Sequence, residues 1–332
     1  MTVSHTDDDQ TFDFETVSDV QLTRKERARR LTDEYVLAPF RVLWSDYRAR
    51  IGLIIIGFFL LLGTVGTMVV PEPEYHGAPK HLQPFVDMAH PLGTDHQGRG
   101  LMSQAVHATV PMLQMIIAGA VFSTFMATII GTVSGYKGGP VDRVSMYIVD
   151  IVMTIPSLPL VIVLAATLQP KDPIVVGLVL SITAWAGLSR NIRSQVLSLR
   201  EEPYIEASRT MGLSTATILA KDVTPNIMPY VMVHFVQTAR NIIFASVALY
   251  FLGFLPAQSG TKNWGVMLNQ AYNNGGLIAP SLYFWFAVPM VAIVLLSYGL
   301  IMLGQGTDRI FNPRIRARHA KTVDDDETNI NS

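Results

Sequence analysis

The sequence contains no cysteine, and only 15% of its 332 residues are charged. Without cysteine there can be no disulfide, no thiolate nucleophile and no cysteine-ligated metal. Soluble domains carry roughly 25% charged residues, so a chain that is 49% hydrophobic and 15% charged is typical of a membrane protein. The formal net charge of −1 argues against the basic surface that nucleic-acid binding requires, so we expect no nucleic-acid partner.

Reactive motifs are also missing. The chain has no GxxxxGKS/T phosphate loop, no HExxH zinc helix and no GxSxG nucleophile elbow. We therefore expect no catalytic residues and no cofactor bound by this chain. Five of the eight histidines lie in or near one polar segment, but their spacings fit no common set of metal ligands, so we predict no metal site; they are His76, His81, His90, His96 and His107.

Six apolar runs approach the roughly 20 residues that a helix needs to cross a bilayer. They cover residues 51–70, 112–134, 144–168, 174–188, 227–255 and 283–303. Lysine and arginine favour the cytoplasmic side, and with six spans twenty of them fall on the side of the termini and four on the other side. The prediction is an all-α integral membrane protein with six transmembrane helices and both termini in the cytoplasm.

Composition divides the chain into four parts. Residues 1–30 are expected to form a disordered cytoplasmic tail, and residues 313–332 an acidic one. Residues 31–110 hold the first span, a long outer loop and a predicted helix over 31–47 that lies on membrane lipid. A simple helical lead-in to the first span fits 31–47 equally well. Residues 111–312 form the core transmembrane domain.

A polar passage from Glu201 to Pro229 interrupts the apolar runs on the cytoplasmic side. Pro203 suits the first turn of a helix, Gly212 can take the left-handed conformation that ends it, and Ser214 can cap a second helix. The second helix is predicted to run towards Pro225. Two short helices joined by a sharp turn would project from the membrane.

The motif residues of this passage are Glu206, Ala207, Ser208, Gly212 and Pro225. Their order resembles the EAA loop of the permease subunits of ATP-binding-cassette importers. Three further passages resemble the C-type permeases of dipeptide, oligopeptide and nickel importers: HPLGTDHQGRG, SRNIRSQVLSLREEPYIEA, and ALYFLGF followed by KNWGVML. The resemblance covers about residues 35–312 in matching order. Ser208, Gly100, Ser246 and Tyr147 depart from the family pattern.

The resemblance implies the type I importer permease fold in the plasma membrane of a prokaryote. The loop around Glu206 would be a coupling helix that docks on cytoplasmic ATPase subunits, which bind the ATP and magnesium. A second permease subunit would share the path, and an extracytoplasmic solute-binding protein would deliver the solute. The outer-loop residues expected to contact a partner are His90, Gly93, Thr94, Asp95, Gly98 and Arg99.

Polar residues inside spans are costly and usually face the interior. His234, Gln237 and Asn241 share one face of the fifth span, with Arg240 beside them, and Asp150 precedes a proline kink in the third span. We predict that these five residues line the translocation path and that Arg240 attracts a carboxylate. A packing role fits the stripe equally well, and Asp150 needs a partner that the sequence does not identify.

Two other classes of protein fit the sequence less well. A standalone secondary carrier or channel leaves the coupling loop unexplained, and a membrane scaffold does not account for polar residues within spans. The resemblance favours short peptides as the solute, with nickel and oligosaccharides as alternatives.

Overall fold

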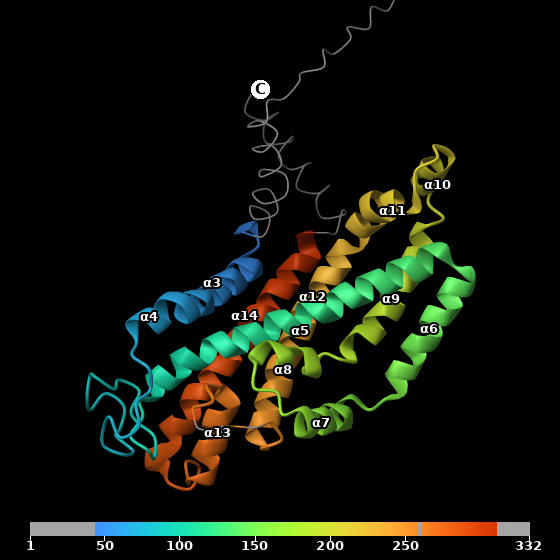
Figure 1. Ribbon diagram of the computed structural model, residues 1–332. Coiled ribbons are helices and arrows are strands. Elements are labelled where there is room, and N and C mark those ends of the chain that lie inside the picture. Colours follow the sequence, from blue (N-terminus) through green and yellow to red (C-terminus); the bar gives the residue numbers. More distant parts are fainter. Residues whose placement is uncertain (1–43, 256, 258–259, 311–332) are drawn as a thin grey trace, which may run out of the picture. The chain divides into compact units, whose positions relative to one another are not determined.

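Regular structure is helical throughout the residues that the computed structural model describes, which are 44–255, 257 and 260–310 (Figure 1). One isolated bridge between Thr94 and Gly100 is the single strand-type pairing among them. The predicted tails and most of the predicted helix at 31–47 lie outside these residues. The predicted all-α class is confirmed.

Four helical stretches of the described chain are long and apolar enough to cross a membrane. They are α3 (Tyr47–Leu61) continued through a π-helical turn into α4 (Thr67–Val69), α5 (Leu101–Lys137), α11 (Thr215–Ile218) continued into α12 (Thr224–Phe251), and α14 (Tyr283–Ile310). Two bent pairs qualify together: α6 (Gly139–Thr154) with α7 (Ser157–Leu168), bent by 80°, and α8 (Pro173–Leu180) with α9 (Ala184–Leu199), bent by 55°. Counting each bent pair as one span gives the predicted six.

Both breaks have local causes. Ile155 is extended because a proline disfavours helical backbone in the residue before it, so Pro156 ends α6 and the predicted kink is confirmed. The fourth span was predicted as one helix over 174–188, which is wrong. The break lies at Ser181, which leaves helical geometry and whose hydroxyl donates to the Gly177 carbonyl at 3.0 Å, a bond that often bends helices.

The long helix α5 packs along α8, α9 and α12. Small residues let these backbones approach closely, as is usual for helices in membranes. A side chain at Gly131 would collide with Ile192 of α9, and one at Gly135 would collide with Val196. Gly131 and Gly135 therefore form a GxxxG pair, the spacing typical of closely packed membrane helices.

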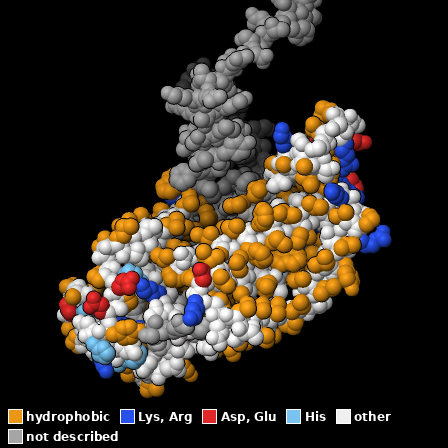
Figure 2. Space-filling view, in the orientation of Figure 1, with side chains coloured by type: hydrophobic (Ala, Val, Ile, Leu, Met, Phe, Trp, Pro, Cys, Tyr) orange, Lys and Arg blue, Asp and Glu red, His pale blue; other side chains and the backbone are white. Residues whose placement is uncertain are grey.

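The two ends of the helical bundle carry different polar structures. Hydrophobic side chains cover the face of the spans seen in Figure 2, and the charged side chains there gather mainly towards two ends. The segment 70–100 and α13 (Trp264–Asn273) lie at one end, and α10 (Pro203–Thr210) lies at the other (Figure 1). A chain with several such apolar helices is a multi-pass membrane protein, and the two polar structures lie at opposite ends of its helical bundle.

Candidate functional site

The passage from Glu201 to Pro229 begins as the sequence predicts. Pro203 opens α10, where its missing N–H removes no helical hydrogen bond. Gly212 has a φ of 76°, which few other residues tolerate, and the chain turns there. Ser214 caps α11 by accepting a hydrogen bond from the Thr217 amide at 3.2 Å.

The short helix α10 has an inner and an outer face. Ile205 is fully buried and packs in one cluster with Ile218 and Val223, while Glu206 and Ala207 are exposed. Ser208 is buried as well, which corrects the prediction that it lies on the docking surface. Since it lies three residues after Ile205, it falls on the same helical face.

An apolar patch lies on the outer side of the same loop. Tyr204 and Leu213 are each 44% exposed, and Met211 is 70% exposed. Exposed apolar side chains beside charged ones, on a loop that projects from the membrane, are typical of a surface that binds another protein. This patch was not predicted, although the apolar residues on either side of Gly212 in a polar passage are a signal for it.

Arg209 ties α10 to the membrane-spanning helices. Its guanidinium donates to the Tyr136 hydroxyl of α5 at 3.2 Å and to the Arg200 carbonyl at 3.1 Å. It also lies 5.1 Å from the centre of the Tyr136 ring. The loop is therefore fixed to two spans by a side chain that the sequence analysis did not single out.

The second helix does not end near Pro225 as predicted. A π-helical turn over Leu219–Val223 joins α11 to α12, so the helix from Thr215 to Phe251 is continuous. Pro225 lies in the first turn of α12, where it has no N–H to satisfy. The wider turn just before it absorbs the change of geometry. Pro225 is therefore part of a span, and α10 is connected directly to two spans, α9 before it and α11–α12 after it.

A cavity of about 730 Å³ lies where the two broken spans meet α12. His234, Gln237 and Asn241 all line it, as their spacing predicts. Asn191 of α9 also lines it, together with residues from both breaks: Ile155, Pro156, Ser181 and Thr183. The residues that line the cavity are apolar or polar, and none of them is Asp, Glu, Lys or Arg.

Arg240 and Asp150 do not line this cavity, and their place on the path stays a prediction. Successive helix residues are about 100° apart, so Arg240 lies about 60° from Gln237 on the side away from Asn241. Asp150 forms an ion pair with Arg190 of α9, and Asp142 forms a second one with Arg193. These pairs join α6 to α9, the helix that leads into α10. Arg190, 40 residues beyond Asp150, is the partner that the sequence did not identify.

The outer-loop motif is mostly internal. Thr94 and Asp95 are fully buried, and Arg99 is 7% exposed. Gly93 and Gly98 are buried with φ of 82° and 72°, and a side chain at either would collide with a neighbouring backbone carbonyl. Gly93, Thr94, Asp95 and Gly98 hold the loop together and have little surface for direct contact with a partner, whereas the Arg99 side chain also lines a pocket.

Asp95 is the centre of that loop. Its Oδ1 accepts from the amides of Gln97 and Arg99 at 2.8 and 2.9 Å. Its Oδ2 accepts from Arg99 Nε at 2.7 Å and from Gln104 Nε2 at 3.0 Å. His90 is half-buried beside Gly100, where a Cβ would lie 2.9 Å from its Nδ1.

Two histidines of the loop pack on a buried tryptophan. The rings of His81 and His96 lie 5.5 and 5.3 Å from the ring of Trp285, which is fully buried. Burial lowers the pKa of His96. Within the described part of the chain, no three His, Asp or Glu side chains are placed to hold a metal ion.

Comparison with known proteins agrees with this geometry. Residues 127–317 match the family described as the binding-protein-dependent transport system inner membrane component. A dipeptide transport permease of Bacillus subtilis, DppC, is 30% identical over 85% of this chain and 87% of its own length. The chain belongs to this permease family. The predicted resemblance to the C-type permeases of peptide importers is confirmed.

Further relatives of the permease carry related names. The oligopeptide transport permease OppC of Bacillus subtilis is 31% identical, over 82% of this chain and 87% of its own length. The glutathione transport permease GsiD of Pectobacterium atrosepticum is 28% identical, over 86% of this chain and 95% of its own length. The alignments extend over most of this chain and most of each relative.

Proposed function

We propose that this permease is one of two membrane subunits of an ATP-driven importer for short peptides, and that α10 couples it to separate ATPase subunits. The exposed face of α10 carries the proposal. Glu206 lies there on a loop whose apolar side chains Tyr204, Met211 and Leu213 are exposed outside the membrane. A carrier or channel that works alone needs no such surface, whereas a docking site for another protein does.

The connections of α10 give a route from an ATPase to the path. α9 precedes α10 and carries Asn191 into the cavity, and α11–α12 follow it and carry His234 into the same cavity. When ATP closes the ATPase subunits, a displaced α10 would move both walls of the cavity. ATP can shift the permease between two states only by favouring one of them, and here it would do so through the contact with α10.

A second permease subunit completes this path. Gln237 and Asn241 are exposed on this chain although they lie in a span, and the cavity is open there. Amide groups that face lipid without partners are costly. A second membrane subunit that packs over this face would cover them and close the path.

The names of the relatives and the side chains that line the cavity both favour short peptides as the solute. The relatives are named for dipeptide, oligopeptide and glutathione transport. The amide side chains of Asn191, Gln237 and Asn241 can donate to and accept from peptide groups. A nickel path would favour carboxylates or a group of histidines, and this lining has one histidine and no carboxylate. The α10 end would then face the cytoplasm, and the end with segment 70–100 a solute-binding protein.

Gentle purification of the tagged permease tests the proposal. We expect an ATPase and a second permease to co-purify with the wild type. The Glu206→Lys variant should lose the ATPase but keep the second permease, and Glu74→Lys, at the opposite end of the bundle, should keep both. If the chain purifies alone and moves solute in vesicles without ATP, the proposal is wrong. Uptake of labelled dipeptide, nickel and oligosaccharide by the assembled importer identifies the solute.

A further inference from the structure

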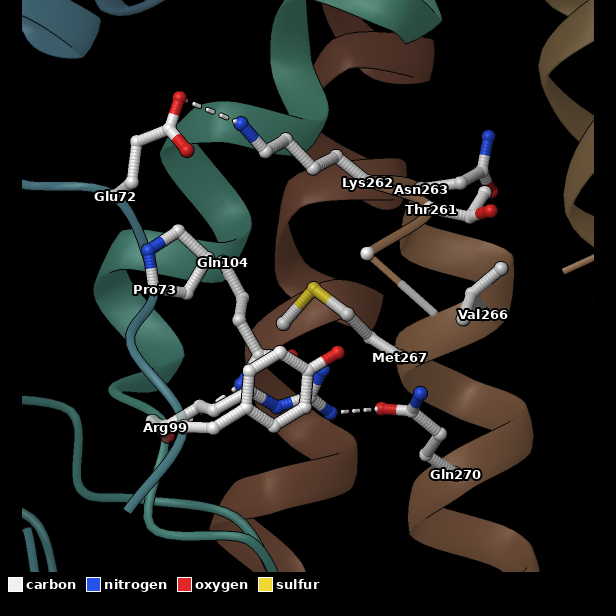
Figure 3. A pocket seen from close by; sticks show the side chains of 12 residues that line it. Glu72, Pro73, Arg99, Gln104, Thr261, Lys262, Asn263, Val266, Met267 and Gln270 are labelled. Carbon is white, nitrogen blue, oxygen red and sulfur yellow. Dashed lines mark hydrogen bonds and ion pairs between the residues drawn. The ribbon is translucent and has the colours of Figure 1, made fainter. Parts of the chain in front are cut away.

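A small polar pocket lies at the end of the bundle opposite α10 (Figure 3). Its volume is about 230 Å³, and it shares no lining residue with the cavity of the path. Two hydrogen bonds cross it, as Figure 3 shows: Lys262 Nζ to Glu72 Oε1 at 2.9 Å, and Arg99 Nη2 to Gln270 Oε1 at 2.6 Å. Each joins the first outer segment to the segment before and within α13.

The two cations of the pocket differ in how firmly they are neutralised. Arg99 is paired with Asp95, which is fully buried and already accepts four hydrogen bonds. Asp95 therefore has no surface from which to reach a molecule in the pocket. Arg99 Nη1 has no hydrogen-bond partner among the described residues, and the Tyr75 ring lies 5.0 Å from the guanidinium carbon. Donor groups of a buried cation therefore remain available.

Glu72 is the pocket residue that another carboxylate can most readily replace. Its side chain is 74% exposed, and that of Lys262 is 32% exposed. The hydrogen bond from Lys262 lowers the pKa of Glu72, so the rim of the pocket favours a carboxylate. Ion pairs this exposed contribute little stability, and water or another carboxylate can replace Glu72 readily.

We propose that this pocket receives an acidic side chain of the external solute-binding protein, which displaces Glu72 from Lys262 and bonds to Arg99. The proposal rests on the function proposed above. A volume of about 230 Å³ is below the roughly 300–1,000 Å³ of pockets that hold whole small molecules, and it fits one side chain. The position outside the spans and away from the path points to a protein partner and not to the transported solute.

Glu72 then competes with the partner for Lys262, and this makes the proposal testable. Glu72→Gln removes the competitor and should tighten binding of the solute-binding protein several-fold. Lys262→Gln removes the cation and should weaken binding by roughly tenfold, because a charge-assisted hydrogen bond is lost. If the Glu72–Lys262 pair were only a structural latch, both variants would break the same bond and would act in the same direction.

The measurement is the Kd between the assembled importer in nanodiscs and the solute-binding protein that co-purifies with it, loaded with solute. Lys171→Gln, an exposed lysine outside the pocket, is the matched control and should leave the Kd unchanged. Recovery of the second permease with each variant shows that it assembles. If the Kd shifts in the same direction in Glu72→Gln and Lys262→Gln, or shifts in neither variant, the pocket proposal is wrong while the proposed importer function is unaffected. Absence of binding to the wild type overturns the proposed function as well.

Discussion

Truncation of Ile205 to alanine should loosen α10 without touching its outer face. The helix has eight residues, too few to be stable alone in water, so it depends on its inner contacts. Ile205 is fully buried, and removing three of its carbons leaves a cavity that costs about 2–5 kcal/mol. At about 2 kcal/mol, the open form of the loop becomes roughly 30 times more populated, since each 1.4 kcal/mol is a factor of ten.

Amide hydrogen exchange of residues 203–213 in the assembled importer measures this opening. Ile205→Ala should speed exchange roughly 30-fold or more and lower the solute moved per ATP hydrolysed. Tyr204→Ala is the matched control, because Tyr204 is the preceding residue and is 44% exposed. It should leave exchange almost unchanged and weaken ATPase binding. Equal exchange in the two variants would refute the assignment of inner and outer faces.

Two further predictions concern side chains away from α10. Reversing the charge of either Asp150 or Arg190 alone should reduce folded yield and transport, and exchanging the two residues should restore both. A double-mutant cycle should give a coupling energy of about 0.5–3 kcal/mol. Strictly additive effects of the two substitutions would refute the ion pair. Burial lowers the pKa of His96 in the folded loop, so the unfolded loop binds more protons as pH falls through the ordinary value of 6.5, and the loop should lose stability there. The amide protection factors of residues 76–100, which are corrected for the pH dependence of intrinsic exchange, should therefore fall below that pH in the wild type and fall less in His96→Gln. The same pH profile of protection in both proteins would contradict this.

Much of the fold could be predicted because membrane spans leave a strong pattern. The apolar runs located the spans, and Pro156 located the first break. The second break lies at Ser181, whose hydroxyl bonds to the Gly177 carbonyl. Thr124 and Thr128 make the same kind of bond within the unbroken helix α5, so the break could not be read from the sequence. The continuity of α11 with α12 was missed for a similar reason. A π-helical turn has no sequence signature as clear as that of a proline.

The site was predicted in part, and the errors share one cause. Helical spacing placed His234, Gln237 and Asn241 on one face correctly, because only local geometry was needed. The burial of Ser208 and of Asp95 depends on which elements cover them, and that information lies far away in the chain. A motif shows that residues matter together, but it does not show whether they form a surface or support one.

The absence of cysteine gives a direct test of the central claim, that α10 docks on an ATPase. A single cysteine in place of the exposed Ala207, labelled with benzophenone maleimide in native membranes and illuminated, should cross-link to an ATPase chain. A cysteine in place of Glu74, on the opposite end of the bundle, should not. If Ala207→Cys labels only lipid while Glu74→Cys captures the ATPase, both the coupling role of α10 and the orientation of the permease are wrong.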